Sequence, residues 1–236
     1  MTSSFENKKI VIAGGTSGIG LATAQLFAAA KASVTVTGRN QEKLRAAEQA
    51  GFKTAGVDSS NRSAIDAFFK AHGPIDHLVI AVSGSKGAGN FKDLSLDTLR
   101  EGFEQKFWAQ LHTIQAALPY MQTGGSITLI TAISAIAELP GVSGLAAING
   151  ALELMVPILA KELKPLRINA VSPGVVDTSW WDFLPQEARQ ATFAQFSTQI
   201  AVGRVAQPDE IAQAILFVAG NGYMTGKVIG CDGGLS

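Results

Sequence analysis

Ile10-Val-Ile-Ala-Gly-Gly-Thr-Ser-Gly-Ile-Gly20 is the stretch of this 236-residue chain that decides its fold. It predicts a buried strand that runs directly into a glycine-rich turn and then into an Ala-rich helix reaching about Ala30. Its glycines allow a tight turn and let backbone N–H groups approach a pyrophosphate, which then lies at the positive end of the helix. Such a loop can also be a mobile connection, but the strand before it and the helix after it are the context that a dinucleotide site requires.

Short β-rich runs alternate with longer helical patterns along the rest of the chain. Further strands are expected at residues 33–37, 54–57, 77–82, 126–131, 167–171 and 228–231, and helices around residues 41–49, 63–71, 96–118, 144–163 and 208–219. This alternation predicts one α/β domain over residues 1–236, a doubly wound parallel β-sheet (Rossmann fold) with helices on both faces. Ligands of such sheets bind beyond the carboxyl ends of the strands, so we expect the chemistry there.

The composition disfavours several classes of function. Lys plus Arg and Asp plus Glu both number 19, so nothing favours nucleic acid or an anionic membrane. The single cysteine, Cys231, excludes an internal disulfide, and the three scattered histidines form no metal-ligand cluster. No apolar leader precedes the first strand, and no uninterrupted apolar run approaches the roughly 20 residues that span a bilayer. We therefore expect a cytoplasmic protein that acts on a small-molecule substrate, with no metal, nucleic acid or membrane as partner.

The end of the second expected strand indicates which dinucleotide binds. Arg39 and Asn40 stand there, without the carboxylate that accepts hydrogen bonds from the ribose hydroxyls of NAD. A guanidinium beside the adenosine ribose would pair with a 2′-phosphate, so NADP(H) is favoured over NAD(H); the alternative is an ordinary surface arginine. After the third strand, Asp58 and Ser59 are suited to adenine, although Asp58 could equally cap the next helix.

Three motifs in this order resemble those of the short-chain dehydrogenase/reductase family, and the resemblance covers nearly the whole chain. Residues 13–20 are similar to the cofactor loop of that family, residues 167–178 to the segment beneath the nicotinamide, and residues 225–234 to the C-terminal strand. The resemblance implies a nicotinamide dinucleotide as cofactor, for which Arg39 favours NADP(H), and a homodimer or homotetramer. The cofactor contacts expected on this basis are Gly14, Thr16, Ser17, Gly18, Ile19, Gly20, Arg39, Asn40, Asp58, Ser59, Ala81, Val82, Asn149, Pro173, Gly174, Val176 and Thr178.

The catalytic half of the chain departs from the pattern of that family. The family uses a Tyr, a Lys one helical turn later, a Ser thirteen residues before the Tyr, and an Asn on the long fourth helix to move a proton to or from the substrate oxygen. Counted along this sequence, those four positions hold Leu145, Asn149, Ala132 and Lys106. The usual Tyr, Lys and Ser are therefore expected to be replaced.

Other polar groups are candidates for the missing functions. Ser134 lies two residues past Ala132, so in an extended strand its hydroxyl points the same way and could orient a substrate oxygen; a plain loop serine is the alternative. Asn149 can still hydrogen-bond a ribose hydroxyl, but it has no charge with which to lower the pKa of an acid. Lys106 is a cation on an otherwise apolar helix, whereas Lys86 is expected to be solvated.

Two functions from different classes remain open. The first is an NADP(H)-dependent oxidoreductase that transfers a hydride to or from a carbonyl, alcohol or conjugated carbonyl substrate, with Ser134, Asn149 and Lys106 around the oxygen. The second is a catalytically inactive NADP(H)-binding protein that acts as a sensor or partner subunit. Residues 179–204, which begin with Ser-Trp-Trp, are interpreted as a substrate flap, although the tryptophans could instead form an oligomer contact.

Overall fold

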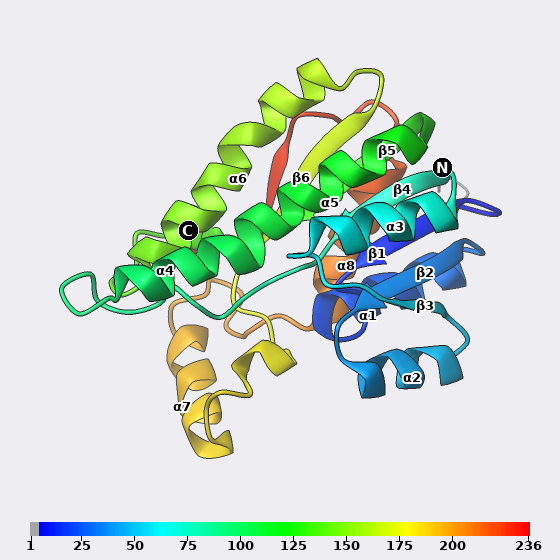
Figure 1. Ribbon diagram of the computed structural model, residues 1–236. Coiled ribbons are helices and arrows are strands. Elements are labelled where there is room, and N and C mark those ends of the chain that lie inside the picture. The colour runs from blue at the N-terminus through cyan, green and yellow to red at the C-terminus, as the bar shows by residue number, and fades with distance from the viewer. Residues whose placement is uncertain (1–4) are drawn as a thin grey trace.

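A parallel sheet forms the centre of the computed structural model, which describes residues 5–236 (Figure 1). Within those residues the strand order is β3-β2-β1-β4-β5-β6-β7, and each strand is parallel to its neighbours. The strands are β1 (Lys9–Ala13), β2 (Ser33–Gly38), β3 (Lys53–Gly56), β4 (Ile75–Ile80), β5 (Met121–Ile130), β6 (Arg167–Pro173) and β7 (Val228–Cys231). The predicted doubly wound parallel sheet is confirmed, and its strand order reverses between β1 and β4.

Both faces of the sheet are covered by helices, as predicted (Figure 1). One face carries α1 (Gly18–Ala29), α2 (Gln41–Gln49) and α8 (Pro208–Gly220), and the other carries α3 (Arg62–His72), α5 (Ala109–Ala117) and α6 (Ser143–Glu162). The central strands are apolar on both sides, which is typical of a parallel sheet buried between two helical layers. Val11 and Leu78 belong to one core, and Ile12 and Val79 to the other.

The helix expected over residues 96–118 is not regular. α4 (Leu96–Gly102) continues into a π-helical segment, η1 (Phe103–Trp108), before α5 begins. A π-helical turn is wider than an α-helical one, so it changes the direction of the side chains on it, and such turns are frequent at functional sites. Here the segment contains Lys106, which is 7% exposed.

The region interpreted as a flap contains a helix that the sequence analysis missed. α7 (Gln186–Ser197) follows a short 3₁₀ turn over Ser179–Trp181, and it projects away from the sheet in Figure 1. No residue of α7 is fully buried. Without a continuous buried face, the helix has only a weak apolar periodicity, which explains why it was missed.

α6 is the one described helix that is long and apolar enough to cross a membrane, judged by length and composition alone. Core helices pass the same test, and α6 buries Ile148, Leu152 and Val156. The sequence analysis did not find such a segment because Asn149 and Glu153 interrupt the apolar run.

A buried histidine in β4 is expected to make the fold less stable in acid. His77 is 7% exposed, and its Nδ1 lies 2.8 Å from the hydroxyl oxygen of Ser126. Burial, reinforced by the charge of Arg167, lowers the pKa of His77 from 6.5 to about 4. The unfolded chain therefore binds the proton more readily, and stability that is present above pH 6.5 is lost as the pH falls toward 4.

We expect His77 to account for a loss of about 3 kcal/mol in the free energy of unfolding over that range. Urea denaturation of the wild type and of His77→Asn at several pH values measures it as the difference between the two pH slopes. Identical slopes would show that His77 does not control the acid sensitivity.

Candidate functional site

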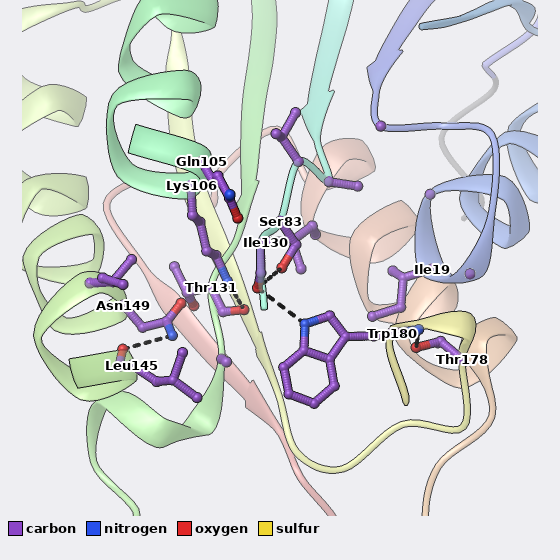
Figure 2. Close-up of a pocket in the computed structure, with 18 of the residues that line it drawn as sticks. Ile19, Ser83, Gln105, Lys106, Ile130, Thr131, Leu145, Asn149, Thr178 and Trp180 are labelled. Carbon is purple, nitrogen blue, oxygen red and sulfur yellow. Dashed lines mark hydrogen bonds between the residues drawn. The ribbon is translucent and has the colours of Figure 1, made fainter. Parts of the chain in front are cut away.

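A cavity of about 1070 Å³ opens at the carboxyl ends of the strands. It is large enough for a dinucleotide cofactor together with a small substrate. The residues predicted to contact the cofactor and the three predicted catalytic residues, Ser134, Asn149 and Lys106, all line this cavity. Figure 2 shows Lys106, Asn149 and Leu145 on one side of it and Ile19 and Thr178 on the other. The structure thus brings the predicted residues together, while their individual roles stay predictions.

The loop after β1 forms a cradle that excludes side chains. Gly14 and Gly18 have positive φ angles of +78° and +52°. A Cβ atom at Gly14 would lie 2.8 Å from the main-chain oxygen of Ala81, and one at Gly20 would lie 2.2 Å from the oxygen of Gly14. Since main-chain atoms cannot move aside cheaply, only glycine fits at these positions. The loop leads into the N-terminus of α1, whose free N–H groups suit a pyrophosphate.

Two cations flank the cavity at the end of β2. Arg39 is exposed at its rim, and Asn40 caps α2 by accepting a hydrogen bond of 2.9 Å from the main-chain N–H of Lys43. This cap places Lys43 so that its Nζ lies 3.5 Å from the hydroxyl oxygen of Ser17 on the cofactor loop. The sequence analysis missed Lys43. Its position four residues after Arg39, at the start of a helix, could have indicated a second cation near the phosphate.

Asp58 does not cap a helix, so that alternative is wrong. The cap of α3 is Asn61, which accepts from a main-chain N–H in the first turn. Asp58 instead accepts hydrogen bonds from the main-chain N–H and the hydroxyl of Ser60. The bond from the main-chain N–H of Ser60 is the largest cause of a lowered pKa for Asp58, and the charge of Arg39 adds to it. Asp58 is thus an ionised group at the edge of the cavity.

The segment after β6 lies against the cofactor loop. A Cβ atom at Gly18 would lie 3.3 Å from the side chain of Thr178, so the two segments are in close contact. The hydroxyl of Thr178 accepts a 3.2 Å hydrogen bond from the main-chain N–H of Trp180 and begins the 3₁₀ turn.

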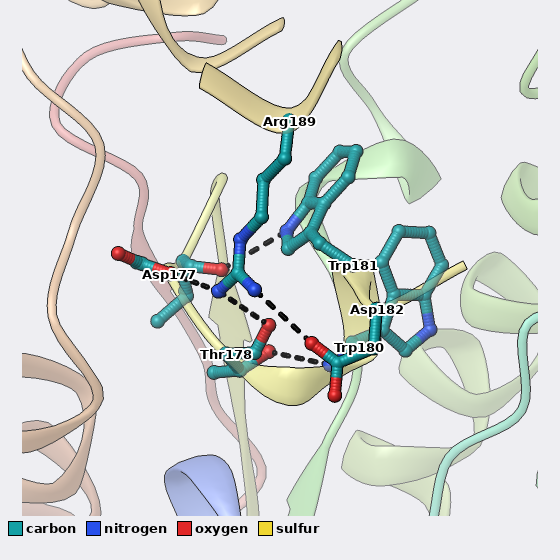
Figure 3. Close-up of polar contacts among 7 residues, drawn as sticks. Asp177, Thr178, Trp180, Trp181, Asp182 and Arg189 are labelled. Carbon is teal, nitrogen blue, oxygen red and sulfur yellow. Dashed lines mark hydrogen bonds and ion pairs between the residues drawn. The ribbon is translucent and has the colours of Figure 1, made fainter. Parts of the chain in front are cut away.

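Arg189 on α7 fixes the base of the flap (Figure 3). Its guanidinium donates to Asp182 at 3.0 Å, to the carboxylate of Asp177, and to the main-chain oxygen of Thr178 at 3.0 Å. The same group lies over the ring of Phe193, 5.4 Å from the ring centroid. These contacts tie α7 to the segment that carries Thr178.

Trp180 joins the segment after β6 to the loop after β4. Its indole N–H donates to the main-chain oxygen of Gly84, on the loop after β4, at 3.1 Å. The indole lies within the cavity in Figure 2 and packs edge-on against Trp181 and Phe183. Aromatic side chains therefore form one wall of the cavity.

Lys106 is a buried ammonium at the centre of the site. Its Nζ donates to the main-chain oxygen of Thr131 at 3.0 Å. Burial disfavours the charge and lowers the pKa of Lys106 from 10.5 to about 8, while Glu153 opposes this shift. A lysine with such a pKa is still mainly protonated at pH 7, yet releases its proton far more readily than a solvated lysine.

Asn149 and Ser134 lie together, but not for the reason expected from the sequence. The strand ends at Ile130, and Ser134 lies on a 3₁₀ turn, so the premise of an extended strand is wrong. That turn brings its hydroxyl to within 3.0 Å of Asn149 Nδ2, which also donates to the main-chain oxygen of Leu145 at 2.9 Å. Asn149 Oδ1 is buried without a hydrogen-bond partner in the protein.

Lys86 lies at the mouth of the cavity, largely in solvent as expected, and its Nζ is 3.8 Å from a carboxylate oxygen of Glu101. Among residues 5–236, no group of three or more His, Cys, Asp or Glu side chains is arranged to hold a metal ion.

The chain is similar in sequence to known reductases. A family model described as enoyl-(acyl carrier protein) reductase matches residues 13–236. The 3-oxoacyl-(acyl-carrier-protein) reductase FabG of Thermotoga maritima is 32% identical over 252 residues, which cover 98% of each chain.

Two solved structures share the fold. A small-chain dehydrogenase in complex with NADPH superimposes with a TM-score of 0.86 at 32% identity, covering 98% of this chain and 99% of the other. The NADPH-bound structure of a short-chain oxidoreductase from Pseudomonas aeruginosa, described as containing an atypical catalytic center, gives a TM-score of 0.88 at 29% identity. That superposition covers 97% of this chain and 96% of the other.

Proposed function

The chain belongs to the short-chain dehydrogenase/reductase family of oxidoreductases, and from this we propose that it is an NADP(H)-dependent enzyme with a non-standard active site. Its reaction is hydride transfer to or from a carbonyl, an alcohol or a conjugated carbonyl compound. The observation that carries the proposal is that one cavity contains both a nucleotide cradle and a buried ammonium, Lys106. Relatives solved with NADPH support the choice of cofactor.

The residues of the cavity fit a dinucleotide. The loop from Gly14 to Gly20 would hold the pyrophosphate, because a Cβ atom there would fill the cradle. Arg39 and Lys43 would hold a 2′-phosphate, and the amide of Asn149, which lines the cavity, would hydrogen-bond a ribose hydroxyl. When bound, NADP(H) would supply or accept the hydride.

Lys106 holds the proton that the reaction needs. Reduction of a carbonyl leaves negative charge on its oxygen, and an ammonium with a pKa of about 8 can donate to that oxygen at neutral pH. Asn149 and Ser134 would orient the oxygen by hydrogen bonds, and Leu145 would keep water away from it. A conjugated or quinone-like carbonyl suits this site best, because its reduced form requires the least help from a protein acid.

The test is a fluorescence titration with NADPH and NADH, followed by NADPH oxidation with a panel of aldehydes, ketones, enones and quinones. We expect NADPH to bind more tightly and at least one conjugated carbonyl to be reduced. Background oxidation with every compound would reject the enzyme, and failure to bind either dinucleotide would reject the cofactor site as well.

Leu145 favours a second candidate, a catalytically inactive NADP(H)-binding protein that acts as a sensor or partner subunit. It stands where the family has its acid, and the carbon side chain provides no proton. If this candidate holds, the triple variant Ala132→Ser, Leu145→Tyr, Asn149→Lys gains turnover that the parent chain lacks. Turnover by the parent chain rejects it.

Arg39 is expected to set the preference for NADPH. The charge-assisted bond between its guanidinium and a 2′-phosphate contributes about 1.5–3 kcal/mol, so Arg39→Ala should raise the Kd for NADPH by roughly 10- to 150-fold. The Kd for NADH, which lacks that phosphate, should stay nearly unchanged. Arg45→Ala, at an exposed position of α2 outside the cavity lining, is the matched control. Equal losses for both dinucleotides would mean that Arg39 acts on the fold and not on the phosphate.

We also propose that the protein is a cytoplasmic homodimer or homotetramer that needs neither nucleic acid nor membrane. Large apolar side chains remain exposed on the outer surface of α6 and η1, namely Leu154, Ile158 and Trp108. Such a surface suits contact with a second copy of the chain.

A further inference from the structure

Thr131 forms hydrogen bonds with both Lys106 and Glu153. Its main-chain oxygen accepts the hydrogen bond from Lys106 Nζ at 3.0 Å, and its hydroxyl donates to Glu153 Oε1 at 2.7 Å. The hydroxyl of Ser172, at the end of β6, donates to the same oxygen at 2.8 Å. Thr131 and Ser172 are each 2% exposed and Glu153 is half-buried, so the carboxylate is partly shielded from water. Two hydroxyl donors on one oxygen hold the Glu153 side chain in place.

Glu153 has no role in the cofactor and substrate contacts proposed above. It lies one helical turn after Asn149 on α6, but it is not among the residues that line the cavity. A substrate or cofactor in the cavity would therefore not touch it. Any effect of Glu153 on the reaction must pass through Thr131 and Lys106.

Apart from Glu153, the charged side chains near Lys106 have little influence on its charge. The elements that pack against η1 are α4, α5 and α6. The remaining titratable or charged side chains on these elements and on η1 itself are Asp97, Arg100, Glu101, Glu104, His112, Lys161 and Glu162. Apart from the half-buried His112, all of them are exposed, so water screens their charges. Lys86, on the loop after β4, is also exposed.

We propose that Glu153 is a positioning residue that keeps Lys106 charged and, through Thr131, holds its ammonium at the ends of β5 and β6. This inference rests on the proposed role of Lys106 as the proton donor. A buried ammonium without a nearby anion loses its proton at a lower pH, because nothing offsets the cost of removing the charge from water. Glu153 therefore determines the pH above which Lys106 has lost its proton and can no longer act as the acid.

The test is Glu153→Gln, which keeps the shape and an acceptor for both hydroxyls but removes the charge. In the pH profile of kcat for NADPH-dependent reduction, activity falls on the alkaline side as Lys106 loses its proton. We expect that limb to move toward acid by about one pH unit in Glu153→Gln, and to return toward its original position in Glu153→Asp. Glu162→Gln, at the exposed end of the same helix, is the matched control and should leave the profile unchanged.

A second measurement does not depend on turnover. NMR of the protein labelled with ¹³C-lysine follows the Cε resonance of Lys106, which is assigned by its loss in Lys106→Met. The pH midpoint of this resonance should move in Glu153→Gln in the same direction as the kinetic limb. A shifted resonance in a protein that reduces no carbonyl would reject the proposed function while supporting the link between Glu153 and Lys106. An unmoved resonance and an unmoved limb would overturn the inference about Glu153 alone.

If Glu153→Gln fails to fold, Thr131→Val replaces it, because this variant keeps the carboxylate and the main-chain acceptor of Lys106. Loss of the Thr131 hydroxyl removes a hydrogen bond that holds the Glu153 carboxylate in place, so the carboxylate can move away from Lys106 and the pH midpoint of the Lys106 resonance should move in the same direction by a smaller amount. An unmoved resonance in this variant would also overturn the inference.

Discussion

Lys106→Met is expected to lower kcat for NADPH-dependent carbonyl reduction by roughly 10²- to 10⁴-fold at pH 7, the usual contribution of a positioned general acid. Methionine preserves most of the side-chain volume but has no proton to give. The neighbouring polar groups, the amide of Asn149 and the hydroxyl of Ser134, can donate hydrogen bonds but are poor acids at neutral pH. No group at the centre of the site therefore replaces the ammonium.

Two controls separate this effect from damage to the fold. Lys106→Met removes the cost of burying an ammonium but leaves the main-chain oxygen of Thr131 without its donor and Glu153 without its cation, so thermal unfolding must show that the variant is folded at the assay temperature. Lys86→Met removes the other lysine near the substrate end, which is exposed and paired with Glu101. A surface pair contributes about 0–1 kcal/mol, so kcat should change less than about fivefold in Lys86→Met.

The readout is kcat at saturating substrate, together with the Kd for NADPH. We expect the Kd to change little in Lys106→Met, because the glycine-rich loop proposed to hold the phosphates lies on the opposite side of the cavity from Lys106 (Figure 2). If kcat stays at the wild-type level, Lys106 is not the proton donor, and a water molecule or a substrate group must take that role.

Gly20→Ala is expected to weaken NADPH binding by about 10²-fold, which corresponds to the loss of one or two hydrogen bonds to the charged phosphates. The added Cβ would lie 2.2 Å from the main-chain oxygen of Gly14 and 3.0 Å from Cα of Gly15. These atoms belong to the loop that would hold the pyrophosphate, so relieving the contact pulls the loop away from the start of α1. The N–H groups that should converge on the phosphates then no longer do so.

Gly150→Ala is the matched control for that variant. Gly150 lies inside α6, where an added Cβ would meet no atom within 4 Å. Alanine favours a helix interior over glycine by roughly 0.5–1 kcal/mol, so the control should be as stable as the wild type or slightly more so, with unchanged NADPH affinity. Fluorescence titration gives the Kd and thermal unfolding gives the stability. Wild-type affinity in a folded Gly20→Ala protein would contradict the assignment of the cradle.

Several details of the fold could not be predicted from the sequence. β4 ends at Ile80 and not at residue 82, although Ala81 and Val82 are apolar, because these residues turn out of the sheet into the cavity lining. β5 begins at Met121, five residues earlier than expected. Its first half is mostly exposed and contains Gln122 and Thr123, so the apolar pattern of a buried strand is absent there.

The residues predicted for the site line one cavity, because their loops follow strands whose ends meet at one edge of the sheet, and their individual roles stay predictions. Lys43, the bond between Trp180 and Gly84, and the contact of Thr131 with Glu153 were missed. Each joins segments that are distant in the chain, and no local pattern marks them.

The sequence by itself determined the parallel α/β architecture, the position of the glycine-rich loop and the absence of a tyrosine at position 145. These depend on local properties, since periodicity, glycine conformation and residue type act over a few neighbouring positions. Only the tertiary structure decided how Lys106 ionises, which partners hold Asn149 and Ser134, and how the flap is fixed. The ionisation of a side chain depends on how much water it loses and which charges surround it, and the fold sets both by packing distant segments together.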